Sequence, residues 1–556
     1  MKNGKAELVF LPLGGAGEIG MNLNAYGYGP EEDRQWVIVD IGVTFGGADT
    51  PGVELILPDP SFLEGENVRA IVLTHAHEDH IGAIAWLWPR FEVPIYATPF
   101  TAALVREKLK ERGLEARAKI QVVELGGELQ IGPFAMQLVT LTHSIPEPNG
   151  LIIRTPLGAI WHTGDWKIDP DPLIGELTDE AALRALGDQG VLAMVCDSTN
   201  VFVEGESGSE AGVRESLIEL VAQKRGRVAV TAFASNVARI ETAIEAARAS
   251  GRSVCLVGRS MHKIVRAAQS VGLLTDAPPF IDEEDAGYLP PEAVLYLCTG
   301  SQGEPRAALA RIASGAHRNV VLGKGDTVIF SSRMIPGNEA AIHALYDLLA
   351  ARDVEVITAS DAHTHVSGHP AREELKQMYQ WARPRIAIPV HGERRHLIEH
   401  AALAKSLQVL EAIAPRNGDL IRLAPGPAEV IDEVPAGRLH VDGDKLVPAD
   451  DAALLDRKRI AVEGAITVSM AVSEKKRTIV SGPDIRARGL PRGEEEAFET
   501  ALDLLAQAAE DAYLRLDSAA RANEEAAEQA IIRAVRKASE RMFGKRPLVD
   551  AIVLSI

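Results

Sequence analysis

Apolar and polar positions follow two different patterns along the chain. In the first 200 residues, short runs rich in β-branched side chains are separated by Gly, Pro and Asn, as is typical of strands joined by turns. The expected strands are Leu8 to Leu13, Gln35 to Asp40, Ala70 to Thr74, Phe134 to Leu141 and Leu151 to Thr155, and the clearest helix is Thr101 to Arg112. This region predicts sheets flanked by helices.

Helices and strands alternate regularly from about Gly212 onward, which indicates a parallel α/β unit. The expected helices are Val213 to Gln223, Val237 to Ala249, Met261 to Val271 and Glu339 to Ala350. The expected strands are Arg227 to Ala232, Ser253 to Val257, Ala293 to Cys298, Asn319 to Leu322, Thr327 to Phe330 and Glu355 to Thr358. After this unit, the extended run Ile386 to Val390 returns to the style of the first region.

A stretch rich in Asp, Gly and Pro between Asp432 and Asp456 is interpreted as a linker to a small α/β module. The module is expected to hold strands at Ala461 to Val472, Arg477 to Ser481 and Leu548 to Leu554, and helices at Glu494 to Leu516 and Asn523 to Phe543. Several domains are also what the length of 556 residues requires, because single hydrophobic cores rarely grow beyond about 250 to 300 residues.

Composition narrows the class of protein. With 46% hydrophobic and 24% charged residues, the chain is of the ordinary globular type. It has no apolar run of the roughly 20 residues that span a bilayer, and Cys196, Cys255 and Cys298 lack disulfide or metal spacing, so we expect reduced thiols and a cytoplasmic protein without membrane contact. A net charge of −20 argues against non-specific coating of nucleic acid. A site for a polyanion must be local, with metal ions supplying positive charge.

One glycine-rich motif imitates a nucleotide site. Gly15 to Gly20 matches the pattern G-x-G-x-x-G, and Asp40 follows at the end of a strand. In a dinucleotide site a helix must follow the glycines to receive the pyrophosphate, but residues 21–35 hold Asn, Gly and Pro among alternating apolar residues. A second strand is expected there, so we interpret the motif as a turn beside a functional site.

The densest group of metal-competent side chains is His75-Ala-His-Glu-Asp-His80, directly after a buried strand. Residues i and i+2 of an extended segment point the same way, so His75 and His77 can hold one ion, while Asp79 and His80 on the following turn can face a second. Burying these groups together without a cation would leave repulsion and unmet hydrogen bonds. Two adjacent cations suit hydrolytic phosphoryl chemistry.

Further ligand candidates stand at the ends of apolar runs downstream, namely His143, Asp165 and His391. Each alone is a choice between a ligand and a surface polar residue, but the ordered set is much more specific. The order resembles the metallo-β-lactamase superfamily, with Asp40, the cluster from His75 to His80, His143 and Asp165 at its four successive motif positions.

This resemblance implies an αββα sandwich with two zinc ions, for which Mn or Mg can substitute in the cell. It implies His75, His77 and His143 as ligands of one ion, Asp79, His80 and His391 as ligands of the other, Asp165 as the bridge and Asp40 as a residue that orients a ligand. Members of the family also carry a structural calcium site. In this chain the corresponding stretch, Thr44 to Gly52, offers only Asp49 as a ligand, and Asp442 and Asp444 are further candidates. Calcium binding is therefore left open.

Most of the chain between Asp165 and His391 is the α/β unit, which should cap the metal site. This insertion resembles the β-CASP domain of nucleic-acid-processing enzymes, with Asp197, His369 and His391 as its motif residues. The stretches Thr231 to Asn236 and His365 to His369, the length and the C-terminal module resemble the ribonuclease J family over essentially the whole chain. The implied parts are a metallo-β-lactamase domain in two segments, 1–207 and 370–431, a β-CASP domain, 208–369, a linker, 432–456, and a C-terminal domain, 457–556.

The resemblance implies a zinc-dependent ribonuclease that acts in RNA maturation and decay as a 5′-to-3′ exonuclease on 5′-monophosphorylated RNA, and it leaves the extent of endonuclease activity open. The expected catalytic residues are Asp79 or Asp165, which orient the attacking water, His369, which protonates the leaving 3′ oxygen, and Asp197. The expected pocket for the 5′ phosphate consists of Ala234, Ser235, Asn236, His365, Val366, Ser367, Gly368 and His369. Ser235 and Asn236 have a second interpretation, as caps of the helix that begins near Val237.

Two other functions remain as alternatives. A small-ester or thioester hydrolase on the same metal scaffold is disfavoured by so large a cap, and an inactive RNA-binding scaffold is disfavoured by the intact ligand set. The resemblance also implies a homodimer or higher homo-oligomer and leaves room for partner proteins of RNA degradation.

Overall fold

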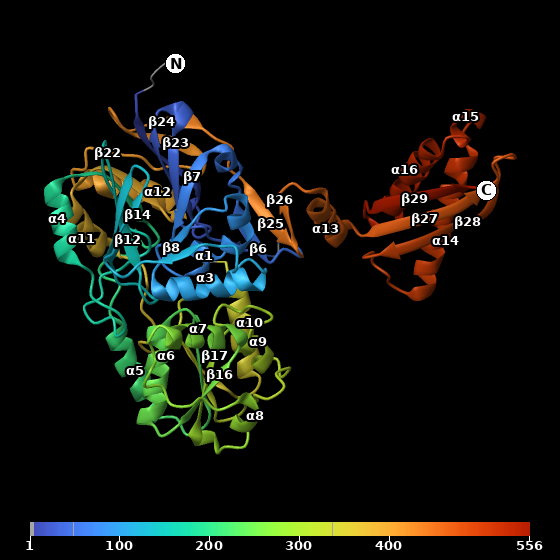
Figure 1. The fold of residues 1–556 in the computed structure, drawn as a ribbon. Helices are drawn as coiled ribbons and strands as arrows, with labels where there is room; N and C mark the ends of the chain where they lie inside the picture. Colours follow the sequence, from blue (N-terminus) through green and yellow to red (C-terminus); the bar gives the residue numbers. More distant parts are fainter. Residues whose placement is uncertain (1–4, 48, 336) are drawn as a thin grey trace. The chain divides into compact units, whose positions relative to one another are not determined.

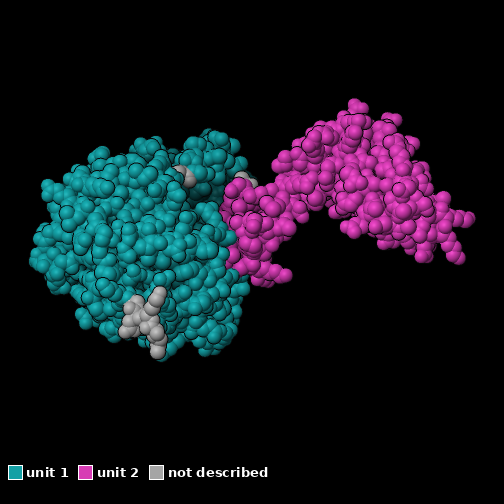
Figure 2. Space-filling model, turned by 90° about the horizontal axis from the view of Figure 1, so that it is seen from above, with its two compact units in different colours: residues 1–44, 57–438 teal, residues 45–56, 439–556 magenta. Residues whose placement is uncertain are grey.

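The computed structural model describes residues 5–47, 49–335 and 337–556. It divides into two compact units, one of residues 1–44 and 57–438 and one of residues 45–56 and 439–556 (Figure 2). The boundaries expected for the individual domains remain a prediction.

Two sheets with a shared core form the sandwich of the first unit. The first sheet has the order β24 (Glu429–Glu433), β23 (Asp419–Ala424), β1 (Glu7–Gly14), β3 (Leu23–Gly29), β4 (Gln35–Val39), β7 (Asn67–Val72), β8 (Ile95–Ala97) and β9 (Ile120–Val122). The second has the order β10 (Glu128–Ile131), β11 (Phe134–Thr140), β12 (Asn149–Thr155), β13 (Gly158–His162), β14 (Val191–Asp197), β20 (Pro384–Val390) and β22 (Glu411–Ala412). Fully buried side chains such as Phe10, Val37 and Ile388 join them.

Helices cover the outer faces of both sheets (Figure 1). On the first sheet, α2 (Ile84–Leu87) packs against α3 (Pro99–Glu111), which contacts β8 and β9. On the second, α4 (Glu180–Gln189), α11 (Arg372–Ala382) and α12 (Arg394–Ser406) close a separate core that contains Trp161 and Trp381. The predicted αββα sandwich is therefore confirmed.

The inserted domain is a parallel α/β unit, as predicted, but its sheet has five strands and not the six expected. Its order is β16 (Ser253–Val257), β17 (Val294–Cys298), β15 (Val228–Thr231), β18 (Thr327–Phe330) and β19 (Glu355–Ile357). Its helices include α5 (Glu210–Ala222), α6 (Val237–Ala249), α7 (Arg259–Ser270), α9 (Ala308–Ala313) and α10 (Glu339–Ala350). The strand expected at Asn319 to Leu322 is wrong: Val320 and Leu322 are buried, but the backbone N–H of Val320 donates to Nδ1 of His317 instead of joining a sheet.

The second unit is built on a three-stranded sheet in the order β28 (Ile479–Arg488), β27 (Ala465–Val472) and β29 (Leu548–Ser555). The helices α14 (Glu495–Leu514) and α16 (Glu524–Phe543) cover one face of it. The segment expected to begin a strand at Ala461 is instead the end of α13 (Ala452–Glu463), which stops at Gly464 with φ 79°. The stretch interpreted as a linker also holds the hairpin of β25 (Arg438–Asp442) and β26 (Lys445–Pro448), in which Asp442 ends the first strand and Gly443 and Asp444 form the turn.

Three further expectations can be compared with the structure. A strand, β3, follows the glycine-rich motif in the chain, where a dinucleotide site would need a helix. Cys196, Cys255 and Cys298 are buried free thiols. Among the described residues, none of the helices combines the length and the apolar character that a bilayer crossing requires.

Candidate metal centre

The metal-competent side chains follow strands that end at one edge of the sandwich. The cluster from His75 to His80 lies between β7 and α1 (Glu78–Ile81), while His143, Asp165 and His391 follow β11, β13 and β20. The glycine-rich motif lies beside them, because the N–H of His391 donates to the carbonyl of Gly15 at 2.7 Å. Residues distant in sequence therefore converge at the ends of these strands.

The first group comprises His75, His77, His143 and Asp165. Nδ1 of His77 lies 3.1 Å from Nε2 of His75 and 3.0 Å from Nε2 of His143. Oδ2 of Asp165 lies 3.9 Å from the same two Nε2 atoms. Neighbouring ligands of a tetrahedral zinc ion with Zn–N bonds near 2.0 Å are about 3.3 Å apart, so this donor set fits such an ion.

The second group comprises Asp79, His80, Asp165 and His391. Oδ2 of Asp165 lies 3.2 Å from Nε2 of His80 and 3.0 Å from Nε2 of His391. Oδ2 of Asp79 lies 3.6 Å and 3.4 Å from these nitrogens. Asp165 thus belongs to both groups through one oxygen atom, which is the arrangement of a bridging carboxylate.

Hydrogen bonds on the outer sides of the rings turn the inner nitrogens toward the cluster. Nδ1 of His80 lies 2.7 Å from Oδ2 of Asp40, and Nδ1 of His143 is hydrogen-bonded to the carbonyl of Gly368. Asp40 is held in turn by the backbone N–H and the hydroxyl of Thr74, both at 2.8 Å. Such outer bonds fix the tautomer of metal-binding histidines, and Asp40 stands where an orienting residue must.

Burial and neighbouring charge set the protonation states. Burial and then nearby imidazoles hold the pKa of His75 and His143 well below the ordinary value, and burial lowers the pKa of His77 to about 4. Burial alone would raise the pKa of Asp165, but His391 and a second imidazole hold it well below its usual range. His75, His77 and His143 as neutral imidazoles and Asp165 as an ionised carboxylate are therefore in the forms that bind metal ions.

His369 and Asp197 form a pair at the margin of the cluster. Nδ1 of His369 lies 2.8 Å from Oδ2 of Asp197. Burial lowers the pKa of His369, but the charge of Asp197 and the hydrogen bond to it outweigh this effect and raise the pKa to about 9. The side chains of His369 and Asp79 are 23% and 29% exposed, whereas that of Asp165 is 2% exposed. His369 and Asp79 therefore face whatever enters the site.

The two stretches expected to bind phosphate are joined by Arg239, whose guanidinium donates to the carbonyl of Thr364 at 2.9 Å. Asn236 caps α6, because its side-chain oxygen accepts the N–H of Arg239 at 2.9 Å, and its amide group donates to Glu210 at 3.3 Å. The capping interpretation therefore holds for Asn236, whose side-chain oxygen and amide group are both hydrogen-bonded. In contrast, the hydroxyl of Ser235 has no hydrogen-bond partner in the described part of the chain.

Of the remaining pocket residues, Gly368 packs tightly beside the cluster. Val366 is buried. A Cβ atom on Gly368 would lie 2.6 Å from Oγ of Ser144 and 2.9 Å from the ring of His143, so only glycine fits between the loop and this imidazole.

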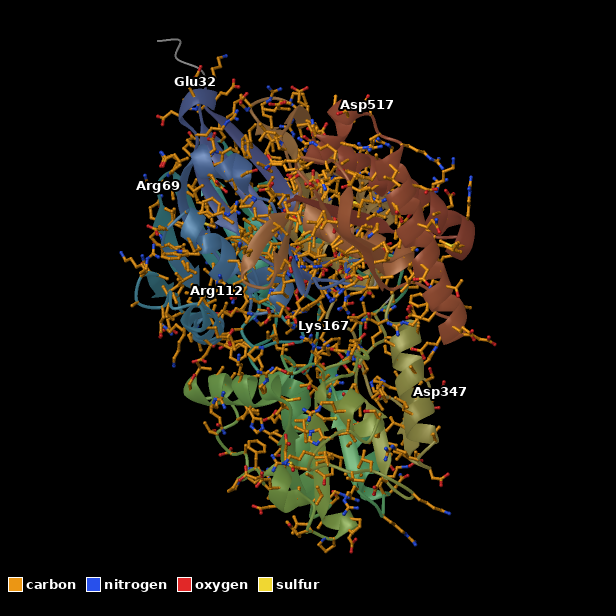
Figure 3. The ribbon with its side chains drawn as sticks, turned by 90° about the vertical axis from the view of Figure 1, so that its right-hand side faces the viewer. Glu32, Arg69, Arg112, Lys167, Asp347 and Asp517 are labelled. Atoms are coloured by element: carbon orange, nitrogen blue, oxygen red, sulfur yellow. The ribbon has the colours of Figure 1, made fainter. Side chains whose placement is uncertain are left out.

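A buried ion network at the joint between the sandwich and the inserted domain was not predicted. Lys167, which is labelled in Figure 3, pairs with Asp169 at 2.7 Å. Asp169 accepts the N–H of Glu210 at the start of α5 at 3.0 Å, and Glu210 pairs with the fully buried Arg239 at 2.8 Å. The partners come from separate elements. The sequence around each of them therefore shows a charged residue but does not indicate that these residues form a buried network.

Four sequence families match successive parts of the chain. Residues 35–187 match the beta-lactamase superfamily domain and residues 225–349 the ribonuclease J beta-CASP domain. Residues 354–415 match the Zn-dependent metallo-hydrolase RNA specificity domain and residues 452–556 the ribonuclease J C-terminal domain.

Comparison with curated proteins extends over the whole length. The chain is 47% identical over 552 residues to a ribonuclease J of Sinorhizobium meliloti, covering 99% of this chain and 98% of that protein. The chain belongs to the ribonuclease J family. It is also 40% identical to a ribonuclease J of Corynebacterium glutamicum, covering 90% of this chain and 71% of that protein, and 38% identical to ribonuclease J 1 of Streptococcus pyogenes, covering 87% and 86%.

Membership of the ribonuclease J family establishes the reaction class. The chain is a metal-dependent ribonuclease of the β-CASP branch, as expected, and the ester-hydrolase alternative finds no support in these relatives. A solved structure of a protein of unknown function from Enterococcus faecalis covers 75% of this chain and 100% of that one with a TM-score of 0.50 and 16% identity, a likeness of fold alone.

Proposed function

We propose that this ribonuclease J chain degrades 5′-monophosphorylated RNA stepwise from the 5′ end, with internal cleavage as an accompanying mode, in RNA maturation and decay. The observation that supports the proposal most is the proximity of hydrogen-bond donors for phosphate to the metal-competent cluster. Ser367 stands two residues before His369, whose Nδ1 lies 3.9 Å from Oδ2 of the bridging Asp165. A terminal phosphate bound there would leave the first phosphodiester at the cluster.

Two divalent cations would be held by the two groups of ligands described above. A first ion would take His75, His77 and His143, and a second Asp79, His80 and His391, with Asp165 between them. The predominance of imidazole favours zinc over Mn and Mg, which prefer oxygen ligands. When bound, such a pair of cations lowers the pKa of water and neutralises charge on a phosphodiester.

The protein's own groups then position the water and move the proton. Asp79, which is partly exposed and faces the second group, orients the attacking water. Asp197 accepts a hydrogen bond from Nδ1 of His369 and leaves the Nε2–H free to protonate the leaving 3′ oxygen. The expected product carries a 5′ phosphate.

Hydroxyl groups supply the neutral part of the phosphate pocket. Oγ of Ser367 accepts hydrogen bonds from Asn200 at 2.7 Å and from the N–H of His369 at 3.2 Å, so its own proton can be donated to an anion. The unpartnered hydroxyl of Ser235 is a second donor. A 5′ triphosphate would be too bulky for such a pocket.

The test compares one transcript with a 5′ monophosphate or a 5′ triphosphate, labelled at either end. The proposal expects mononucleotides from the 5′ label, little attack on the triphosphate and weaker discrimination in Ser367→Ala. Equal degradation of both RNAs by both proteins would rule out the pocket and leave internal cleavage alone.

We further propose a homodimer or higher homo-oligomer to which the C-terminal module contributes. The strand β29 lies at the edge of its sheet and exposes Ile552 and Leu554, at 46% and 56%. Light scattering on a chain that ends before α13 tests this, and an unchanged mass per particle would exclude the module from the interface. Protein partners and the calcium site stay predictions; Asp442 is engaged by Arg457 at 2.8 Å.

A further inference from the structure

One arginine that the proposed reaction does not use lies at the carboxyl ends of the strands of the inserted sheet. Arg333 follows β18, which pairs in parallel with β15, and Ala234 and Ser235 of the predicted pocket stand shortly after the end of β15 at Thr231. The carboxyl ends of neighbouring parallel strands meet at the same edge, where ligands of open α/β sheets bind. Arg333 and this pocket stretch therefore share one edge.

Arg333 reaches the rest of the pocket through Asn200. Its Nη1 donates to Oδ1 of Asn200 at 3.1 Å. The amide group of Asn200 donates to Oγ of Ser367 at 2.7 Å and to the carbonyl of His369 at 3.0 Å. The side chain of Arg333 is exposed, and no carboxylate among the described residues pairs with it. Most of the five donors of this guanidinium are therefore available to a ligand.

The loop that carries Arg333 is held in place by Gln302. The amide group of Gln302 donates to the carbonyl of Arg333 at 2.8 Å, and its oxygen accepts the N–H of Ile335 at 3.0 Å and the side chain of Asn338 at 3.3 Å. Gln302 is buried. A charge presented from such an anchored loop costs less conformational entropy on binding.

His365 gives an independent indication of an anion site. Its Nδ1 is buried and has no hydrogen-bond partner among the described residues. Burial, together with the positive charges of Arg239, Arg333 and Lys167, lowers the pKa of His365 to about 3. Arg239 and Lys167 are each paired with a buried carboxylate, which leaves Arg333 as the unneutralised charge. An anion would balance that charge and accept hydrogen bonds from this region.

We propose that Arg333 is a specificity-determining residue that binds the terminal 5′ phosphate of the RNA. The inference rests on the proposed 5′ exonuclease function and adds the positive charge that the hydroxyl donors of the pocket lack. In a chain with a net charge of −20, a local guanidinium gives a 5′ phosphate its advantage over a 5′ hydroxyl. A phosphate of the RNA backbone offers the same chemistry and is the competing occupant.

The test uses three variants of the full-length protein. Arg333→Gln removes the charge but keeps a donor for Asn200, and Arg333→Lys keeps the charge. Arg225→Gln is the matched control, because Arg225 is also exposed but precedes β15 at the opposite edge of the same sheet. KM and kcat are measured on one single-stranded RNA sequence with a 5′ monophosphate or a 5′ hydroxyl.

The expected effect of Arg333→Gln appears only with the RNA that carries a 5′ monophosphate. Arg333→Gln should raise KM for the monophosphorylated RNA by about 10- to 100-fold, the range of a lost charge-assisted hydrogen bond, with kcat and the hydroxyl substrate nearly unchanged. Arg333→Lys should recover part of the loss, and Arg225→Gln should behave as wild type.

Two results would overturn the role of Arg333. An equal loss on both RNAs would assign it to a backbone phosphate, and unchanged discrimination in Arg333→Gln would remove it from the site. A wild-type protein that does not distinguish the two 5′ ends would instead overturn the exonuclease proposal itself. Because the side chain of Arg333 is exposed, the thermal midpoint of unfolding of the Arg333→Gln protein should match that of wild type.

Discussion

Replacing Asp197 with Asn should move the alkaline limit of activity to lower pH. The substitution nearly preserves shape but removes the charge that lies 2.8 Å from Nδ1 of His369. The carboxylate also accepts the backbone N–H of Thr199 at 2.8 Å. Because an amide has a single accepting oxygen, the variant must lose one of these two bonds as well.

The size of the effect follows from the pKa of His369. Burial lowers this pKa, whereas Asp197, with smaller contributions from Asp165 and Asp79, raises it to about 9. An unperturbed histidine titrates at about 6.5, which sets the largest fall to expect when the charge of Asp197 is removed. The difference of about 2.5 corresponds to about 3 kcal/mol. A general acid must be protonated, so activity is lost as the pH rises through its pKa. At pH 8 the protonated fraction would fall from about 0.9 to about 0.03, or about 30-fold.

The assay is the single-turnover rate on 5′-monophosphorylated RNA between pH 6 and pH 9.5. Bound cations would lower the pKa of His369 in both proteins, so the comparison between them carries the test, with metal content measured in each. Asp188→Asn, a change of an exposed aspartate on α4, is the control. An alkaline limit that is the same in Asp197→Asn and wild type would refute the role of His369 as the acid that Asp197 holds.

Three further changes test the metal ligands and the buried groups of the surrounding fold separately. His77→Ala should remove at least one metal ion and abolish hydrolysis with an unchanged circular dichroism spectrum, since the ligand stands on a loop; elemental analysis that finds both ions retained would contradict this. Arg239→Ala leaves Glu210 buried without its partner and should lower the free energy of unfolding in urea by about 3 to 5 kcal/mol, so a loss under about 1 kcal/mol would count against the network. Burial lowers the pKa of His400 to about 4, so the unfolded chain takes up the proton first as the pH falls below about 6.5, and His400 should contribute about 2 kcal/mol to the loss of stability from pH 7 to pH 5. His400→Gln should therefore lose less stability than wild type over this range, and an equally steep fall would show that only other groups are responsible.

The local pattern of apolar and polar residues predicted the helices and strands of the inserted domain well, because helices and strands alternate regularly in this domain. The helices α6 and α10 and the strands β16 and β18 begin and end at the predicted residues. The error at Asn319 to Leu322 has a physical cause. Val320 and Leu322 are buried and Val321 is 65% exposed, so side chains alternate as in a strand, but no neighbouring strand pairs with the backbone. Periodicity reports burial and does not report pairing.

The candidate ligands could be found from sequence because each stands at the end of an apolar run in a dense or ordered motif. Arg333 had no such signal, because its meaning depends on Asn200, 133 residues away. The same holds for Lys167, whose burial depends on how the inserted domain joins the sandwich. For Asn236 the sequence left two roles open, and only the contact with Arg239 distinguishes them.

The most direct test of the metal centre is anomalous diffraction from crystals of the purified protein, collected above and below the zinc absorption edge. Two peaks are predicted, one bounded by His75, His77 and His143 and the other by Asp79, His80 and His391, with the carboxylate of Asp165 between them. A single peak, or peaks away from these residues in a protein that still cleaves RNA, would contradict the assignment.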